Sequence, residues 1–352
     1  MYNMIMKIES LILSGFRNHQ KRTFLFSQVT IFIGKNTSGK TSILESLYML
    51  SHGKSFKAEK DTDVITTHNL FARAECRIFE NNDEKKLAII IANQNNRISK
   101  KYLVNNVSRR QSDFISNLLT VLFTPEDLEI INNSPSVRRE YINSILSQSN
   151  KQYRLAVSLY EKALKRRNRM LYLSREGKKF FTLDEFEYWD NLVIENGQII
   201  TRFREEFIDY VNSAAKEIFD MHIHYDKSTI SRERLNKYKQ EEIATARTLV
   251  GPQRDDIIFQ FPNGKSVKDF GSRGEQRLTV FQTKLIETLF LIEKTGKTPI
   301  LLLDDIFSEL DEGNIHKVLD LLPHHQVIIT TTHEEFLPKR FEDKKGVTVI
   351  EL

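Results

Sequence analysis

The sequence has few of the features that mark secreted or membrane proteins. It contains one cysteine, Cys76, so no disulfide can form within the chain, as suits a reducing compartment. No apolar run reaches the roughly 18 residues that a membrane span needs, and residues 1–7 lack the layout of a signal peptide. We therefore expect a cytoplasmic protein with no membrane association.

A strong charge of either sign is also absent. The net charge of +5 and the pI near 9.0 are compatible with nucleic-acid binding but do not establish it. Apolar residues make up 40% of the chain and charged residues 28%, which is ordinary for a globular protein. With 352 residues, the chain is long enough for two domains or for one domain with a large insertion.

Residues 34–41 match the G-x-x-x-x-G-K-S/T pattern of a phosphate-binding loop. A buried strand is predicted before the loop, over residues 29–33, and an amphipathic helix after it, over residues 42–50. The N–H groups of such a loop surround a phosphate, while Lys40 reaches the β- and γ-phosphates and Thr41 holds Mg²⁺. The expected ATP-binding residues here are Gly34, Lys35, Asn36, Thr37, Ser38, Gly39, Lys40, Thr41 and Ser42. A chance glycine-rich turn is the weaker alternative, because strand, loop and helix follow in the right order.

A second nucleotide-site motif follows Pro299. Residues 300–305 read as a buried strand that ends in two carboxylates, and α/β sheets bind ligands at the carboxyl ends of their strands. Asp304 is expected to hold Mg²⁺, and Asp305 to orient or deprotonate the attacking water. We therefore expect Lys40, Asp304 and Asp305 to be the catalytic residues. A strand that ends in an ordinary helix cap is the alternative.

Residues 272–276 form a second candidate anion site. Ser272, Gly274 and Gln276 precede an apolar helix predicted over residues 278–291, so a hydroxyl and backbone N–H groups meet at a helix N-terminus. Taken alone, these residues fit a plain N-capped helix start better.

The periodicity of the sequence divides it into three stretches. Residues 1–110 carry alternating or β-branched strand patterns, residues 111–246 are mainly helical, and residues 247–352 return to strands. Long helices are predicted over residues 152–173, 182–196 and 198–219. The simplest architecture is one α/β ATPase domain of mixed sheet and helices, built from both chain ends, with an inserted helical lobe. The insertion is too short for a long coiled coil.

Basic residues are concentrated between residues 151 and 179, where ten Lys or Arg accompany two Glu. Four of them share one face of the predicted helix: Lys162, Lys165, Arg166 and Arg169. An apolar stripe of Leu155, Leu159 and Ala163 lies on a separate face. The basic face suits the phosphates of double-stranded DNA, without base readout. A solvated charged surface is the alternative, and it is the commoner meaning of a charge run.

The motif order and several further segments carry a family resemblance. The phosphate loop, the long insertion, residues 272–276, residues 300–305 and residues 308–311 follow one another as in ATP-binding-cassette ATPases and the head domains of structural-maintenance-of-chromosomes proteins. Residues 13–18, 53–57, 123–128 and 251–256 resemble motifs of the RecF family of bacterial replication and repair proteins. This resemblance covers almost the whole chain.

The resemblance implies a function. Two copies would bind ATP between them, with the Ser272 segment of one copy covering the γ-phosphate on the other, and Arg17 would also contact the nucleotide. The dimer would clamp double-stranded DNA near single-strand gaps and work with RecR and RecO to help RecA replace single-strand-binding protein. The resemblance also makes His333 a candidate γ-phosphate sensor, with a solvated loop histidine as an equal alternative. It implies ATP and Mg²⁺ as cofactors, and gapped DNA and a second copy of the chain as partners.

Some residues depart from the family pattern. Thr37 stands where the family usually has glycine, and a β-branched residue disfavours a positive φ. Glu275 stands where glutamine is common. Asp305 replaces the glutamate of most cassette ATPases, and its shorter side chain predicts slow hydrolysis, as in a switch.

Two other functions remain open. The chain could be a cassette ATPase that acts on a non-DNA partner, such as a membrane permease, although no coupling segment is present. It could also be a scaffold with a structural nucleotide, which predicts no turnover and no ATP-dependent dimer.

Overall fold

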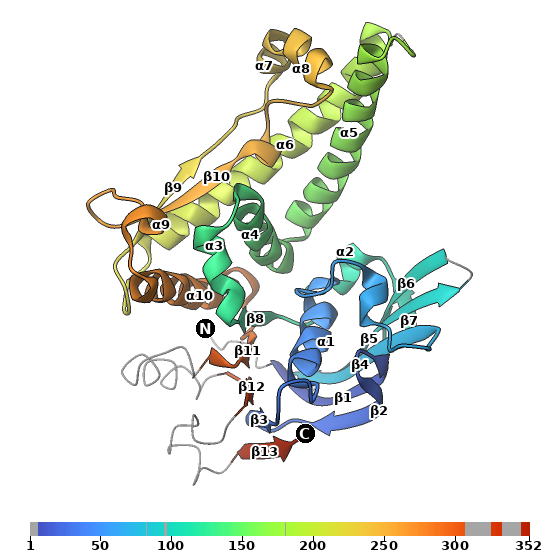
Figure 1. The fold of residues 1–352 in the computed structure, drawn as a ribbon, viewed down its shortest axis with the longest axis vertical. Helices are drawn as coiled ribbons and strands as arrows, with labels where there is room; N and C mark the ends of the chain where they lie inside the picture. Colours follow the sequence, from blue (N-terminus) through green and yellow to red (C-terminus); the bar gives the residue numbers. More distant parts are fainter. Residues whose placement is uncertain (1–5, 82, 95–96, 180, 307–324, 333–345) are drawn as a thin grey trace. The chain divides into compact units, whose positions relative to one another are not determined.

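The computed structural model describes residues 6–81, 83–94, 97–179, 181–306, 325–332 and 346–352. By their internal contacts these residues form two compact units (Figure 1). Unit 1 combines Met1–Asp127 with Lys284–Leu352, and unit 2 is Leu128–Thr283. Within the described ranges, no helix is both long and apolar enough to cross a membrane.

Unit 1 contains a parallel sheet of five strands. Their order is β13 (Val347–Glu351), β3 (Val29–Ile33), β12 (Val327–Thr331), β11 (Ile300–Asp304) and β8 (Thr120–Phe123). Every residue of β11 and β12 is buried, which accounts for their continuous apolar sequences. Because all neighbouring pairs are parallel, the carboxyl ends of β3 and β11 lie at the same edge of the sheet.

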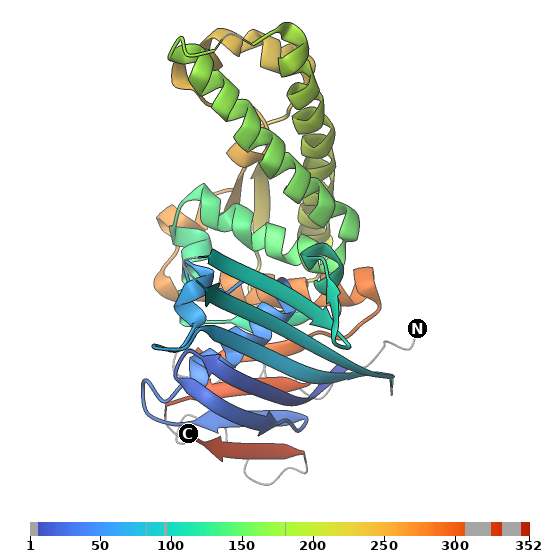
Figure 2. The same ribbon diagram turned by 90° about the vertical axis from the view of Figure 1, so that its right-hand side faces the viewer.

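A second sheet of unit 1 is antiparallel (Figure 2). Its order is β2 (His19–Leu25), β1 (Met6–Phe16), β4 (Phe71–Glu80), β5 (Asp83–Gln94), β6 (Arg97–Val104) and β7 (Val107–Arg109). Helix α1 (Lys40–His52) packs against both sheets, and its Leu47 shares a hydrophobic core with Leu11 and Ile89 of this sheet and Leu302 of the parallel one. The short elements η1 (Asp61–Val64) and α2 (Gln111–Phe114) also belong to this unit.

Unit 2 is mainly helical. Its long helices are α4 (Pro135–Ser149), α5 (Lys151–Arg175) and α6 (Leu183–Ser213), and α5 and α6 lie side by side (Figures 1 and 2). Strands β9 (His222–Asp226) and β10 (Asp256–Gln260) form an antiparallel pair. The shorter elements are α3 (Glu129–Asn132), α7 (Arg232–Lys237), α8 (Lys239–Thr245), η3 (Pro252–Arg254) and α9 (Val267–Phe270). Two elements, η2 (Pro125–Leu128) and α10 (Arg273–Thr295), continue from one unit into the other.

The predicted α/β domain with a helical insertion is confirmed, and no long coiled coil is present in the described parts of the chain. The units divide elsewhere than at the predicted 110/111 and 246/247. Strand β8 pairs with β11, which draws residues up to 127 into unit 1, while β10 pairs with β9 and keeps residues 247–283 in unit 2. Periodicity missed β8 because a four-residue apolar run does not distinguish a buried strand from a helix.

The helices predicted over residues 182–196 and 198–219 are a single helix, α6, which ends at Ser213. Gly197 was expected to separate them, but it lies inside the helix, where its lack of a side chain permits close packing. A Cβ atom at this position would lie 2.7 Å from Ile230 Cγ2, 3.1 Å from Tyr160 Cε2 and 3.3 Å from Pro252 Cδ. The glycine therefore allows neighbouring segments of unit 2 to approach α6.

Buried ion pairs hold the segments of unit 2 together. Arg204 of α6 donates to Asp255 Oδ2 (2.6 Å) and to Pro252 O (2.7 Å), within the family-like stretch 251–256. Burial raises the pKa of Asp255, and the Arg204 guanidinium opposes that rise. Arg167 of α5 is also buried and pairs with Asp190 (2.6 Å) and Glu242 (2.7 Å). Because a buried charge without a partner is strongly destabilising, these pairs restrict how the segments pack.

We expect Gly197→Ala to lower the free energy of unfolding by about 1–3 kcal/mol, because the branched side chain of Ile230 must move to admit a methyl group. The gain of about 1 kcal/mol that alanine has over glycine inside a helix offsets part of the packing cost, so the net loss lies toward the lower end of this range. Gly274→Ala is the matched control, since the nearest atom to an added Cβ there, Ser272 Oγ, is 3.9 Å away. Urea unfolding that gives equal stabilities for Gly197→Ala and the parent would contradict the packing role.

Candidate nucleotide site

The phosphate-binding loop joins β3 to α1 at the carboxyl edge of the parallel sheet. Gly39, the N-cap residue of α1, has φ 101°, a conformation that favours glycine. A Cβ atom there would lie 2.6–2.7 Å from the side chains of His19 and Asn18. Among the described residues, no side chain caps α1 and no acidic residue lies in its first turn, so the N–H groups at its start remain available to an anion.

The Lys40 ammonium lies inside the loop. Its Nζ donates to Gly34 O and to Lys35 O, the latter at 3.0 Å. Burial lowers the pKa of Lys40, while the nearby charges of Asp305 and Asp304 oppose that lowering. A phosphate oxygen would be a stronger acceptor than these carbonyl groups, because both partners of the bond would then be charged.

Thr41 and Asp304, the two expected Mg²⁺ ligands, lie next to each other. Thr41 Oγ1 donates to Asp304 Oδ1 (3.3 Å), and Thr330 Oγ1 donates to the same oxygen. Burial raises the pKa of Asp304. A hydroxyl and a carboxylate side by side fit Mg²⁺, which takes few protein oxygens and completes its coordination with phosphates and water.

Arg17 is held beside the loop by a carboxylate that the sequence analysis missed. Its Nε and Nη2 donate to the two oxygens of Glu45 (2.8 and 2.6 Å), and its Nη1 donates to Asp63 O (2.8 Å). The Glu45 side chain is 1% exposed, so this two-pronged pair lies in a partly dry setting. The hydrogen bond that Arg17 donates to Glu45 raises the pKa of Arg17, which keeps a fixed positive charge at the site.

Asn18 and His19, the two residues that follow Arg17, form hydrogen bonds with the backbone of the phosphate loop. Asn18 Nδ2 donates to Thr37 O (3.1 Å), and His19 Nε2 donates to Gly39 O (3.1 Å). Burial lowers the pKa of His19, so the ring is neutral near pH 7. The family-like segment 13–18 was the signal in the sequence, but its contacts with the loop could not be read from spacing.

One cavity of about 730 Å³ in unit 1 joins these groups. The predicted site residues that line it are Arg17, Asn36, Thr37, Gly39, Lys40, Thr41, Ser42, Asp304 and Asp305. Gly34, Lys35 and Ser38 complete the loop without lining the cavity. Lys57 and Glu126 line it as well and were not predicted. Cations and carboxylates therefore share the cavity, as a phosphate chain with a bound metal ion requires.

Three residues other than glycine have a positive φ around this cavity: Arg17 (53°), Thr37 (77°) and Asp305 (50°). Aspartate is one of the few residues that tolerate this region, whereas β-branched threonine does not. The shorter acid at position 305 thus fits the local backbone better than glutamate would. At Thr37 the strain is real, as the sequence analysis anticipated.

The predicted second anion site has a mixed outcome. Ser272 and Gly274 are exposed at the start of α10, but Ser272 forms a capping box with Glu275: its N–H and Oγ both donate to Glu275 Oε2 (2.8 Å each). Gln276 differs from the prediction. Its buried amide donates to Gly271 O (3.2 Å) and accepts from Asn132 (2.9 Å), so it shapes the loop and does not face outward.

The remaining predicted residues are of two kinds: some lie outside the described residues, and the others lie on α5. His333 and Ser308, Glu309, Leu310 and Asp311 lie outside the described residues. The four predicted DNA-binding side chains, Lys162, Lys165, Arg166 and Arg169, are all exposed on α5. The proposed apolar stripe is wrong for two of its members, because Leu155 and Leu159 are 43% and 47% exposed while Ala163 is buried.

We expect Thr37→Gly to raise the free energy of unfolding by about 1 kcal/mol, because glycine adopts a φ of 77° without steric cost. Asn36→Gly is the control: it lies in the same loop without a positive φ, so the added chain flexibility should lower stability. The measurement is urea unfolding without nucleotide. A Thr37→Gly protein no more stable than Asn36→Gly would contradict the strain.

Comparisons with known proteins agree with this geometry. Residues 7–351 match the model of the RecF/RecN/SMC N-terminal domain. A DNA replication and repair protein RecF from Oceanobacillus iheyensis is 33% identical, and the alignment covers 94% of each chain. Its counterpart from Lachnoclostridium phytofermentans is 34% identical over 98% of each chain.

Solved structures are similar over the same length. A structure of the recombination mediator protein RecF of the RecFOR pathway, in its RecF-ATPrS form, aligns with 100% of this chain and 98% of its own, at 26% identity and a TM-score of 0.88. The RecF-ATP form covers 96% and 94% of the two chains, at 28% identity and a TM-score of 0.87. With the family model, the relatives and the nucleotide-site geometry in agreement, this chain belongs to the RecF family of DNA replication and repair proteins.

Proposed function

We propose that this chain is an ATP-switched DNA-binding protein of recombinational repair and replication. ATP closes two copies around double-stranded DNA near a single-strand gap, and slow hydrolysis releases them. The observation that carries the proposal is the cavity of unit 1, where the side chains of Lys40, Thr41 and Asp304 lie together. The membership of this chain in a family of DNA-repair proteins supports it.

The cavity residues bind the triphosphate of ATP. Lys40 exchanges its two carbonyl acceptors for oxygens of the β- and γ-phosphates, and the N–H groups at the start of α1 contact the same phosphates. Arg17, already positioned by Glu45, adds a cation that needs no rearrangement. Thr41 and Asp304 hold Mg²⁺, which supplies positive charge beside the β- and γ-phosphates when bound.

In the proposed switch, ATP hydrolysis is slow and leads to release of the DNA. Asp305 lines the cavity beside Lys40 and accepts the proton of the attacking water as the bond to the γ-phosphate breaks. Aspartate reaches less far than glutamate, so the water is held less closely. We therefore expect slow hydrolysis, which sets how long the dimer stays closed on DNA.

The exposed start of α10 makes the proposed dimer contact. Ser272 and its neighbouring N–H groups cover the γ-phosphate held by the loop of a second copy, and the reverse contact completes a two-fold arrangement. The exposed cations of α5 contact DNA phosphates without reading bases. By its family, the clamp acts with RecR and RecO to help RecA displace single-strand-binding protein.

Anisotropy of a labelled gapped duplex tests the switch at one fixed salt concentration, because phosphate contacts are strongly salt-dependent. We expect tight binding with ATP or a non-hydrolysable analogue and weak binding with ADP. Lys40→Ala should lose the response to ATP. Lys35→Ala should keep it, because position 35 takes part in the loop through its backbone, and its exposed side chain does not line the cavity. Equal binding in every nucleotide state, or an unimpaired Lys40→Ala, would refute the switch.

Glu275→Gln should strengthen ATP-dependent dimerisation by about two- to fivefold, because it removes a negative charge beside the approaching γ-phosphate. Glutamine still accepts a hydrogen bond from Ser272, so the helix start is kept. Sedimentation velocity with a non-hydrolysable analogue measures the dimer, and Ser272→Arg is the control that should bind ATP yet stay monomeric. A dimer affinity unchanged by Glu275→Gln would argue against phosphate contact at this site.

A further inference from the structure

We propose that a pocket between the ends of α5 and α6 in unit 2 binds one unpaired nucleotide of the single strand at a gap. We name it the tip pocket. The inference rests on the proposed DNA-binding function and deepens it, because it assigns the recognition of the gap to particular side chains.

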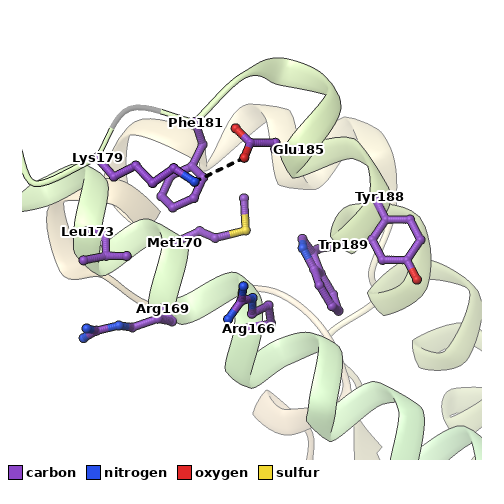
Figure 3. Close-up of a pocket in the computed structure, with 9 residues that line it drawn as sticks. All are labelled: Arg166, Arg169, Met170, Leu173, Lys179, Phe181, Glu185, Tyr188 and Trp189. Carbon is purple, nitrogen blue, oxygen red and sulfur yellow. Dashed lines mark hydrogen bonds and ion pairs between the residues drawn. The ribbon is translucent and has the colours of Figure 1, made fainter.

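The tip pocket has an apolar floor that is held in place. Met170 of α5, Phe181 of the connecting segment and Trp189 of α6 face a cavity of about 420 Å³ (Figure 3). Phe181 and Trp189 pack on the small core formed by Met170, Leu171 and Phe186. Both rings are only partly buried, so part of each ring is open to the cavity.

The rim of the tip pocket is basic. Arg166, Arg169 and Lys179 line it, against one carboxylate, Glu185. Glu185 accepts from the N–H of Thr182 (2.9 Å) and from Lys179 Nζ (3.4 Å), so its charge is already shared. Among the described residues, neither Arg166 nor Arg169 takes part in an ion pair. The rim therefore favours an anionic ligand.

Cations also lie over aromatic rings beside the rim. Lys179 Nζ lies 4.5 Å from the centre of the Phe181 ring, and the Arg169 guanidinium lies 5.1 Å from that of Tyr172. A chain of alternating anions and flat rings suits such a surface, because phosphates meet the cations while a base stacks on the aromatic floor. A single-stranded nucleic acid is such a chain.

Double-stranded DNA alone does not account for the floor. Its bases are stacked on one another, so its phosphates would meet Arg166 and Arg169 while Phe181 and Trp189 stayed unused. At a gap, unpaired bases are free to leave the stack, and rings of this kind recognise them. An acidic peptide matches the rim charge as well, but its carboxylate side chains have no flat ring to stack on Phe181 and Trp189.

The chain contains a single tryptophan, Trp189, so its fluorescence reports on the tip pocket alone. The full-length protein, with a non-hydrolysable ATP analogue at fixed salt, is titrated with short oligothymidine, a gapped duplex, a continuous duplex of equal length, and an oligoglutamate peptide. We expect quenching by oligothymidine and the gapped duplex, and none by the other two.

Variants separate stacking from charge. Phe181→Leu keeps the apolar volume but removes the ring, and should weaken oligothymidine binding about fivefold or more. Arg166→Ala with Arg169→Ala should weaken it at least as much. The matched control is Arg97→Ala with Lys101→Ala, which removes the same charge from exposed positions of β6, outside the tip pocket and outside α5, and should leave the quenching intact. Circular dichroism verifies that each variant is folded.

The results distinguish the tip pocket from phosphate contact alone, from a peptide site and from failure of the proposed clamp. Quenching by the continuous duplex equal to that by the gapped one would overturn the inference in favour of phosphate contact alone, and equal quenching by oligoglutamate would favour a peptide site. Gapped-duplex binding by anisotropy without any change in Trp189 fluorescence would reject the tip pocket and leave the proposed clamp standing. Failure of every DNA to bind in any nucleotide state would reject both.

Discussion

The nucleotide site depends on one packing constraint, the burial of α1 between the two sheets of unit 1. Since α1 follows β3 directly, its N-terminus is forced to the edge where β3 and β11 end, and Lys40 is brought beside Asp304. The same burial places Glu45 beside the site, where its carboxylate accepts hydrogen bonds from Arg17 and from the hydroxyl of Ser55. One buried carboxylate thus links the turn between β1 and β2 to the helix that carries the phosphate loop. A buried charge left unpaired is costly, which makes this link rigid.

The parts of the site that the sequence predicted are those in which one contiguous segment carries both the structure and the chemistry. The phosphate loop and residues 300–305 are of this kind, because strand, turn and polar residue follow within ten positions or so. Asn18, His19 and Glu45 were missed because their roles exist only through contacts with segments 19 to 28 residues away. Phe181 and Trp189 were missed for the same reason: nothing in their spacing places them beside Arg166. Gly197 was placed between two helices because a glycine often ends a helix, whereas here it allows neighbouring segments to pack closely against α6.

Strain is concentrated where the phosphates are expected. The backbones of Arg17, Thr37 and Asp305 share an unusual conformation, and all three residues line one cavity. Such conformations persist only where the surroundings enforce them, and here Val64, Asn18 and Thr330 supply or accept the hydrogen bonds that do so. In the proposed switch, a loop already bent toward the ligand would lose less entropy when ATP binds, which would leave more of the binding energy for bringing two copies together.

The two helix starts that we propose as anion sites, those of α1 and α10, differ in whether their N–H groups are free to bind a phosphate. At α1 the N–H groups have no acidic neighbour in the first turn, so that site is complete before nucleotide arrives. At α10 the Ser272 hydroxyl and N–H are occupied by Glu275, so a phosphate must compete with a carboxylate of the same chain. In the proposed dimer, the second contact would therefore form only when a partner brings a γ-phosphate that displaces Glu275 from Ser272. Hydrolysis would remove that phosphate and let the capping box reform, which would favour opening. The proposed dimer would then respond to the nucleotide state of both copies.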